Sequence, residues 1–498
     1  MTIDDAAEYP ERDDLITPLY EPSCKGDSAR PEETGTTRSS SNNVDNDKEP
    51  ILGTASLTGK STSDTAAQRA AYAAMFAVFV DAINMMCIAP NLPIMVTPGL
   101  HEDSFPSTEP FDIATAQYAH DAVEALGMVI SNFVFGYIAD RIGSRKAILL
   151  LMIGSCCTSV GIYLVRSNYW SFIAMTFANG LFGSAAAIAN GYMFIIYKND
   201  REKADEFGGY VMATLMVGLT VGGLFTLFFP SNLFRPLLLS SALCFLAFVV
   251  CFIFVFVPSE SPVEIDSEPE EDDIPLDKRA ISNVIIGASF DHLGTLGIYP
   301  LAFSPVMYQR FFLDFQIANK VPIMSGNEYR WLFSMIGLAA VPAALLMPLV
   351  NKKLGVAIST IISNLITAGA IIALLSVAAI DPPTHSSFVL YATIIYATFP
   401  FALLSQLSSG AMLDRVTPHD QKSLAQGINN SLYDFATIFT ILFGWISDTK
   451  GYNFALFVCF GLSIVGAFVN VPLIFNKRLG RKEIGNGYNS VGNADCII

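Results

Sequence analysis

Four acidic residues stand out within the long apolar runs of this chain, where a charged side chain is costly: Asp81, Glu124, Asp291 and Asp434. An ionised aspartate at the centre of a membrane-spanning helix costs about 2.5–3.5 kcal/mol on insertion scales. A carboxylate kept at this cost usually faces a bundle interior or an aqueous cavity, where it can bind a cation or exchange a proton. We therefore expect these acids, with Asn84 beside Asp81, to form substrate-binding or proton-binding sites.

Each of these polar residues also has a structural alternative. An acid near a helix end can reach lipid headgroups or accept hydrogen bonds from backbone N–H groups. Asn84, Asn429 and Asn430 can bond between helices instead of lining a polar cavity. His292, which follows Asp291, could relay protons because histidine titrates near physiological pH, or it could be a packing residue.

No pattern in the chain indicates a metal site, a cofactor or an enzyme. The cysteines fall in apolar runs or in the tails, without the Cys-x-x-Cys or His/Cys spacing of a zinc site. No pairing of a nucleophile with a base lies outside the apolar runs. We therefore expect neither catalysis nor a cofactor.

The elements that position the acids are apolar runs long enough to cross a bilayer, which takes about 20 residues. The 498 residues are 52% hydrophobic and 15% charged, whereas a soluble protein carries about 25% charged residues. Six runs precede an acidic segment and six follow it: 71–96, 119–139, 146–166, 170–195, 208–229 and 235–257, then 282–308, 330–350, 355–379, 386–412, 424–446 and 453–475. The pattern predicts an all-α membrane protein with twelve transmembrane helices in two six-helix bundles.

Basic residues predict the orientation and the domain boundaries. They concentrate in the loops that are cytoplasmic when both termini lie inside, as the positive-inside rule requires. The expected order is a disordered acidic cytoplasmic tail (1–68), a first bundle (69–257), an acidic cytoplasmic linker (258–280), a second bundle (281–478) and a short cytoplasmic tail (479–498).

The net charge of −16 belongs to the segments outside the bundles. Residues 1–66 hold 14 acids and 6 bases, and residues 258–277 hold nine acids and no base. Nucleic-acid binding therefore has no support. Residues 11–16 of the tail are similar to an acidic dileucine sorting signal. We expect a multi-pass integral protein of the plasma membrane or of a vacuolar or endosomal membrane.

The two halves of the chain echo each other. An aspartate is followed nine residues later by a proline in the first and the seventh run, at 81–90 and 291–300. Residues 352–355 likewise occupy the place of residues 140–143, with the acid lost. Parallel repeats of this kind place a substrate site between the halves, near the middle of the membrane.

The loop after the second run carries a signature, whose key residues are Gly136, Asp140, Arg141, Gly143 and Arg145. It closely resembles the loop between the second and third spans of the major facilitator superfamily. The resemblance covers roughly residues 69–478 and implies a transporter that works by alternating access. It also implies that these five residues form a gating loop between the bundles.

A second resemblance lies in the fifth run, whose glycines are Gly209, Gly218, Gly222 and Gly223. Their spacing resembles the antiporter motif of the superfamily and implies close helix packing or a kink. Leu219 replaces the proline of that motif. Thr176 stands where these antiporters carry an intramembrane arginine linked to proton coupling, so this coupling loses support.

The acids of the first and eleventh runs, Asp81 and Asp434, make the chain similar to the vesicular amine and multidrug antiporter group. Three functions remain open. The first is a secondary transporter of a small organic solute, cationic or amphiphilic, exchanged against protons. The second is an uncoupled facilitator of a neutral or anionic metabolite. The third is a non-transporting membrane receptor with the same fold.

Overall fold

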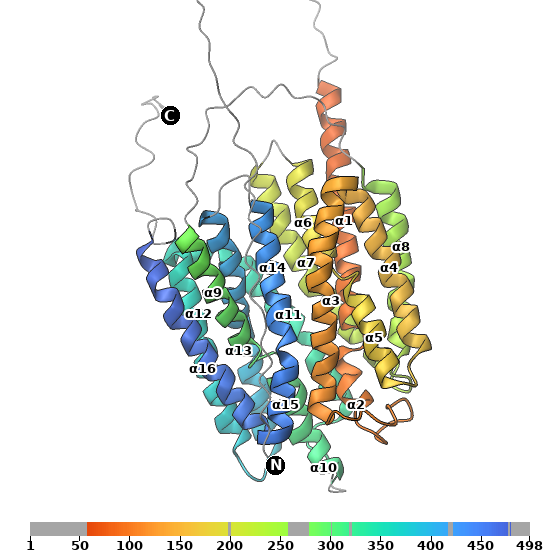
Figure 1. Ribbon diagram of the computed structural model, residues 1–498, viewed down its shortest axis with the longest axis vertical. Coiled ribbons are helices and arrows are strands. Elements are labelled where there is room, and N and C mark those ends of the chain that lie inside the picture. Colours follow the sequence, from red (N-terminus) through yellow and green to blue (C-terminus); the bar gives the residue numbers. More distant parts are fainter. Residues whose placement is uncertain are drawn as a thin grey trace, which may run out of the picture. The chain divides into compact units, whose positions relative to one another are not determined.

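The computed structural model describes residues 57–197, 201–256, 278–299, 301–317, 321–416, 422–476 and 479. Within these residues every regular element is a helix, and no strand occurs (Figure 1). The all-α prediction is therefore confirmed for the described part of the chain. The dileucine-like segment and most of the acidic linker lie outside the described residues.

The first half of the chain forms long helices joined by short connections. In order they are α1 (Leu57–Met86), η1 (Ala89–Asn91), α2 (Leu92–Met95), α3 (Ile113–Ile142), α4 (Ser144–Leu164), α5 (Tyr169–Gly180), α6 (Ala185–Ile196), α7 (Arg201–Phe228) and α8 (Arg235–Phe254). Helix α1 begins at Leu57, so residues 57–68, which the sequence assigned to the tail, are helical. The alanine-rich run after Thr65 has high helix propensity, and the helix extends from it towards the N-terminus.

The second half repeats this organisation with more interruptions. Its elements are α9 (Lys278–Thr295), η2 (Ala302–Met307), η3 (Gln309–Leu313), α10 (Asp314–Ile317), α11 (Gly326–Leu354), α12 (Val356–Ala378), α13 (His385–Val416), α14 (Lys422–Ile438), α15 (Thr440–Lys450), α16 (Tyr452–Asn470) and η5 (Val471–Phe475). Segments η2 and η3 are π-helical. Such segments are rare and often mark functional places in a helix.

Nine helical segments within the described residues are long and apolar enough to cross a membrane. They are 65–95, 113–139, 144–164, 169–193, 209–228, 235–254, 356–378, 385–413 and 452–475. Each coincides with one of the predicted runs, so several membrane-spanning helices are present. The complete set of twelve stays a prediction.

The two halves meet along two seams. In the first seam α7 packs against α11, and in the second α3 packs against α14 and α15. Figure 1 shows α3 running alongside α14 and α15, although they are far apart in the sequence. Any site between the halves must therefore lie between these seams.

Glycines allow the first seam to close at backbone distance. A Cβ built on Gly223 of α7 would stand 2.9 Å from the Cα of Ser334, and one on Gly337 of α11 would stand 2.6 Å from the carbonyl oxygen of Met216. Real Cβ atoms do not approach other atoms this closely. The helices can therefore touch in this way only while both positions are glycine.

Candidate substrate site between the two halves

A buried hydrogen-bond network ties together the interior of the first half. Asn84 of α1 donates to Asn179 Oδ1 of α5 at 3.0 Å. It accepts from the hydroxyls of Ser159 on α4 (2.6 Å) and Ser240 on α8 (2.8 Å). Asn84 therefore forms hydrogen bonds between helices, which is the alternative that the sequence left open. It lies where four helices meet.

Asp81 lies on α1, one turn from this network. It faces the break between α5 and α6, the two helices that form the fourth apolar run. The backbone changes course between α5 and α6, and the first amide of α6, Ala185 N–H, donates to Asp81 Oδ2 at 3.3 Å. A helix N-terminus favours a negative charge. Asp81 is only 2% exposed, and its second oxygen, Oδ1, is buried without a hydrogen-bond partner. One carboxylate oxygen therefore remains available for a ligand or a proton.

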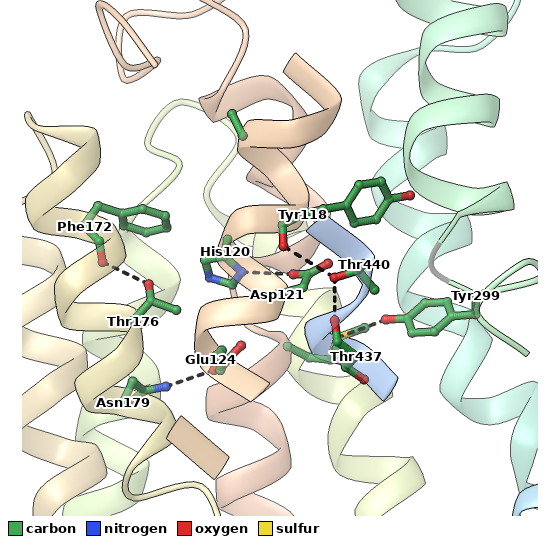
Figure 2. A network of polar contacts seen from close by, with 12 residues as sticks. Tyr118, His120, Asp121, Glu124, Phe172, Thr176, Asn179, Tyr299, Thr437 and Thr440 are labelled. Carbon is green, nitrogen blue, oxygen red and sulfur yellow. Dashed lines mark hydrogen bonds and ion pairs between the residues drawn. The ribbon is translucent and has the colours of Figure 1, made fainter. Parts of the chain in front are cut away.

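Glu124 connects this region to a second titratable group that the sequence analysis did not single out. Its Oε1 accepts from Asn179 Nδ2 at 3.3 Å. One turn earlier on α3, His120 Nδ1 lies 3.0 Å from Asp121 Oδ1, and the His120 ring stacks on Phe172. Figure 2 shows His120, Asp121 and Glu124 along the same stretch of α3. The sequence signal was the cluster of a histidine and two acids within one apolar run.

Asp434 is the predicted site residue that bridges the halves. Its Oδ2 accepts from Asn132 Nδ2 of α3 at 2.8 Å, and the carboxylate is 8% exposed. The neighbouring Ser131 bonds Ser184 at 2.8 Å, just before the α6 amide that holds Asp81. Glu124 is linked to this region through Asn179, which also bonds Asn84, one turn from Asp81. The structure therefore brings three of the four predicted acids into one region.

Asp291 lies apart from these three acids, inside the second half. It is fully buried, and its carboxylate accepts from Asn364 of α12 and from Asn470 of α16, the latter at 3.0 and 3.2 Å. The amides clamp three helices around one acid. His292 beside it is 2% exposed, makes no hydrogen bond through either ring nitrogen, and meets the Tyr433 ring edge-on.

A small cavity separates the halves beside these groups. It measures about 50 Å³ and is lined by Met86, Met216, Leu219, Thr295, Tyr299, Ile336, Gly337, Phe399, Leu403 and Tyr433. This volume holds a water molecule or two, whereas drug-sized ligands occupy about 300–1,000 Å³. Tyr299 OH contacts Met86 Sδ across it at 3.7 Å (Figure 2). The halves must separate here before an organic solute can fit.

The predicted gating loop turns at Gly143, whose φ of 93° favours glycine. Arg145 donates to the Phe252 carbonyl of α8 at 2.7 Å, and Arg141 lies over the Tyr137 ring. Both contacts stay within the first half. The side chain of Asp140 lies outside the described residues.

The predicted glycines of α7 pack against different helices. Gly218 and Gly222 pack on α1, at the backbone of Phe79 and Ile83, and Gly223 faces α11. No described atom lies within 4 Å of a Cβ built on Gly209. Helix α7 runs without a break through all four positions.

Comparison with known proteins adds a family match. The model of the Major Facilitator Superfamily matches residues 74–313. A probable inorganic phosphate transporter 1-9 of Arabidopsis thaliana is 28% identical over 107 residues, and this match covers 19% of each chain. The matched residues make up slightly less than half of the chain.

Solved structures share the fold at low sequence identity. The human organic anion transporter MFSD10 (TETRAN) aligns over 81% of this chain and 99% of its own, with 15% identity and a TM-score of 0.57. A peptide transporter POT aligns over 83% and 95%, with 12% identity and a TM-score of 0.63. The nucleoside transporter NupG aligns over 81% and 99%, with 13% identity and a TM-score of 0.58. The fold is therefore that of these transporters.

Proposed function

We propose that the whole chain is a major facilitator superfamily transporter, which moves a small organic solute across a membrane by alternating access. Twelve spans would form bundles at 69–257 and 281–478, with both termini and the 258–280 linker cytoplasmic. The family match and the two seams between the halves support this organisation. The resident membrane would be the plasma membrane or a vacuolar or endosomal membrane.

We further propose that the solute is cationic or amphiphilic, and that Asp81, Glu124 and Asp434 bind it or the protons exchanged for it. The observation that carries this proposal is the charge of their surroundings. Their hydrogen-bond partners are the amides of Asn132 and Asn179 and one helix N-terminus, and no described Lys or Arg forms an ion pair with them. Asp81 and Asp434 are buried, and buried carboxylates without a fixed counter-charge need a proton or a bound cation.

A facilitator of a neutral or anionic solute is the second candidate. Thr176, which bonds only its own helix carbonyl at Phe172 in place of the antiporter arginine, favours it. The proteins to which the chain is similar also favour it, since they are described as transporters of organic anions, phosphate, peptides and nucleosides. The third candidate, a receptor, differs in binding its ligand without net flux.

Uptake into reconstituted vesicles with an imposed pH gradient separates these candidates. We expect a cationic solute to accumulate with the gradient, and Asp81→Asn or Asp434→Asn to reduce uptake by about tenfold or more. Asp381→Asn, at an exposed loop position, is the matched control and should retain full uptake. Flux of anionic or neutral solutes that ignores the gradient would favour the facilitator, and binding without any flux would favour the receptor.

A further inference from the structure

The signature of the gating loop occurs a second time, at the end of α15. Residues 136–143 read Gly-Tyr-Ile-Ala-Asp-Arg-Ile-Gly, and residues 444–451 read Gly-Trp-Ile-Ser-Asp-Thr-Lys-Gly. In both copies the helix ends at the last glycine with nearly the same backbone angles, φ 93° and ψ 143° at Gly143 and φ 87° and ψ 151° at Gly451. The shared pattern is an early glycine, an acid four residues later and a glycine turn.

The second copy forms hydrogen bonds that connect the two halves. Asp448 accepts from the first backbone amides of α3, with Oδ1 bonded to Ala114 N–H at 3.3 Å and Oδ2 to Thr115 N–H at 2.7 Å. The Thr115 hydroxyl donates to the same Oδ2 at 2.6 Å. Asp112, the residue before α3, makes no side-chain cap of its own. An acid from the second half therefore caps a helix of the first half, where the helix dipole favours negative charge.

The early glycine of the second copy brings the same two helices together. A Cβ built on Gly444 would stand 2.9 Å from the Ala114 carbonyl oxygen and 2.9 Å from the Thr115 Cα. On Gly136, the corresponding glycine of the first copy, no described atom lies within 4 Å of such a Cβ. The early glycine of the second copy is thus in contact across the seam, whereas that of the first copy has no neighbour of this kind among the described residues.

These two copies lie at opposite ends of α3. The second copy contacts the beginning of α3, and the first copy forms its last turns. A helix of 30 residues is about 45 Å long, which is enough to cross the whole bilayer. The contacts therefore belong to opposite membrane surfaces.

We propose that Asp448 and Gly444 form a latch that closes one end of the transport path and that alternates with closure at the Gly136–Gly143 end. With the proposed topology, Asp448 closes the outer end in this structure. The inference rests on the proposed transport function and adds Asp448 as a positioning residue of its cycle. It differs from a simple helix cap because opening one end must close the other.

Hydrogen–deuterium exchange of the full chain in lipid nanodiscs tests the latch. Asp448→Ala removes all three hydrogen bonds, and we expect exchange at the first turn of α3 to rise about fivefold, as for a lost helix cap. Exchange at residues 136–145 should fall at the same time, because the opposite end closes. Gly444→Ala should give the same two changes by steric separation, and it serves as the second variant if Asp448→Ala folds poorly.

Asp103→Ala is the matched control. Asp103 also accepts a backbone bond in a loop, from Leu233 N–H at 3.0 Å, but both residues belong to the first half. This variant should change exchange at neither end of α3. If Asp448→Ala leaves the first turn unchanged, or loosens it without protecting residues 136–145, the reciprocal latch is wrong.

Solute uptake by the same proteins separates this inference from the proposed function. A wild-type protein that transports solute, with no reciprocal exchange in Asp448→Ala, would contradict the latch alone. Reciprocal exchange in a protein that moves no solute would support the latch and contradict transport.

Discussion

Asn132 on α3 donates to Asp434 on α14 at 2.8 Å, and this single bond joins the two halves through a buried carboxylate. The bond lies on the second seam, on the helix that also carries His120, Asp121 and Glu124. A solute or proton that binds Asp434 competes directly with a contact between the halves. If Asp434 binds the solute or proton as we propose, occupancy of the site and separation of the halves would be coupled.

We expect Asn132→Ala to impair transport more than it impairs folding. It removes the amide that bonds Asp434, so the carboxylate loses a contact that the cycle must break and remake. The apparent KM for a cationic solute should change by about tenfold or more, since one hydrogen bond to a charged group is worth about 1.5–3 kcal/mol. Ser131→Ala is the neighbouring control, and an equal effect of both variants on KM would contradict a specific role for Asn132.

His120 should control part of the pH dependence of transport. Histidine is the side chain that titrates near neutral pH, and His120 is buried against Asp121 and Phe172. His120→Gln keeps a polar side chain but removes the titration, so we expect a flatter uptake profile between about pH 5.5 and 8. His385→Gln, near the start of α13, should leave the profile unchanged. An unaltered profile in His120→Gln would exclude His120 from the coupling.

Asn84→Ala should destabilise the first half. The substitution leaves the hydroxyls of Ser159 and Ser240 and the amide oxygen of Asn179 without a partner they now have. Ser159 keeps its bond to the Ser155 carbonyl and Asn179 Oδ1 keeps the Thr158 hydroxyl, so the loss is that of three buried hydrogen bonds, each worth about 0.5–1.5 kcal/mol. Thermal unfolding of the purified protein should occur several degrees lower, whereas Asn327→Ala, at the exposed start of α11, should have little effect. Wild-type stability in Asn84→Ala would mean that water replaces the amide.

Gly337→Ala and Gly223→Ala should each weaken the α7–α11 seam. The added methyl meets the backbone at Met216 in one case and at Ser334 in the other, and neither backbone can yield as a flexible side chain would. We expect lower melting temperatures and reduced uptake. Gly369→Ala is the control, because a Cβ there meets no described atom and alanine has the higher helix propensity. Equal melting temperatures for all three variants would rule out a close seam.

Much of the fold could be predicted from the sequence, because the thickness of the bilayer sets both the length of a hydrophobic run and the length of a membrane-spanning helix. Asp81, Glu124 and Asp434 were visible for the same reason, as isolated acids in apolar runs. The breaks between α5 and α6 and between α14 and α15 could not be predicted, since they depend on packing partners far away in the chain. Asp291 has the same sequence signal as Asp81, and only the amides of Asn364 and Asn470 distinguish its enclosed environment.

The second copy of the signature, at residues 444–451, was also not recognised in the sequence, because its basic residues differ from those of the first copy. Thr449 and Lys450 replace Arg141 and Ile142, so the loop lacks the positive cluster that marks a cytoplasmic turn. Both copies contain the early glycine, the acid and the glycine of the turn. Geometry, and not charge, is what the two turns share.

A tilt of helix α3 about its midpoint would move its two ends in opposite directions. A Cβ on Gly127, near its midpoint, would stand 2.9 Å from the Cα of Gly180, so α3 packs closely against α5 of the same half. A tilt of about 5° around that midpoint displaces each end by about 2 Å, in opposite directions, for a length of about 45 Å. Hydrogen bonds do not survive such a displacement. In the proposed alternating-access cycle, a few degrees of rotation would therefore be enough to separate the halves at one membrane surface and to bring them together at the other.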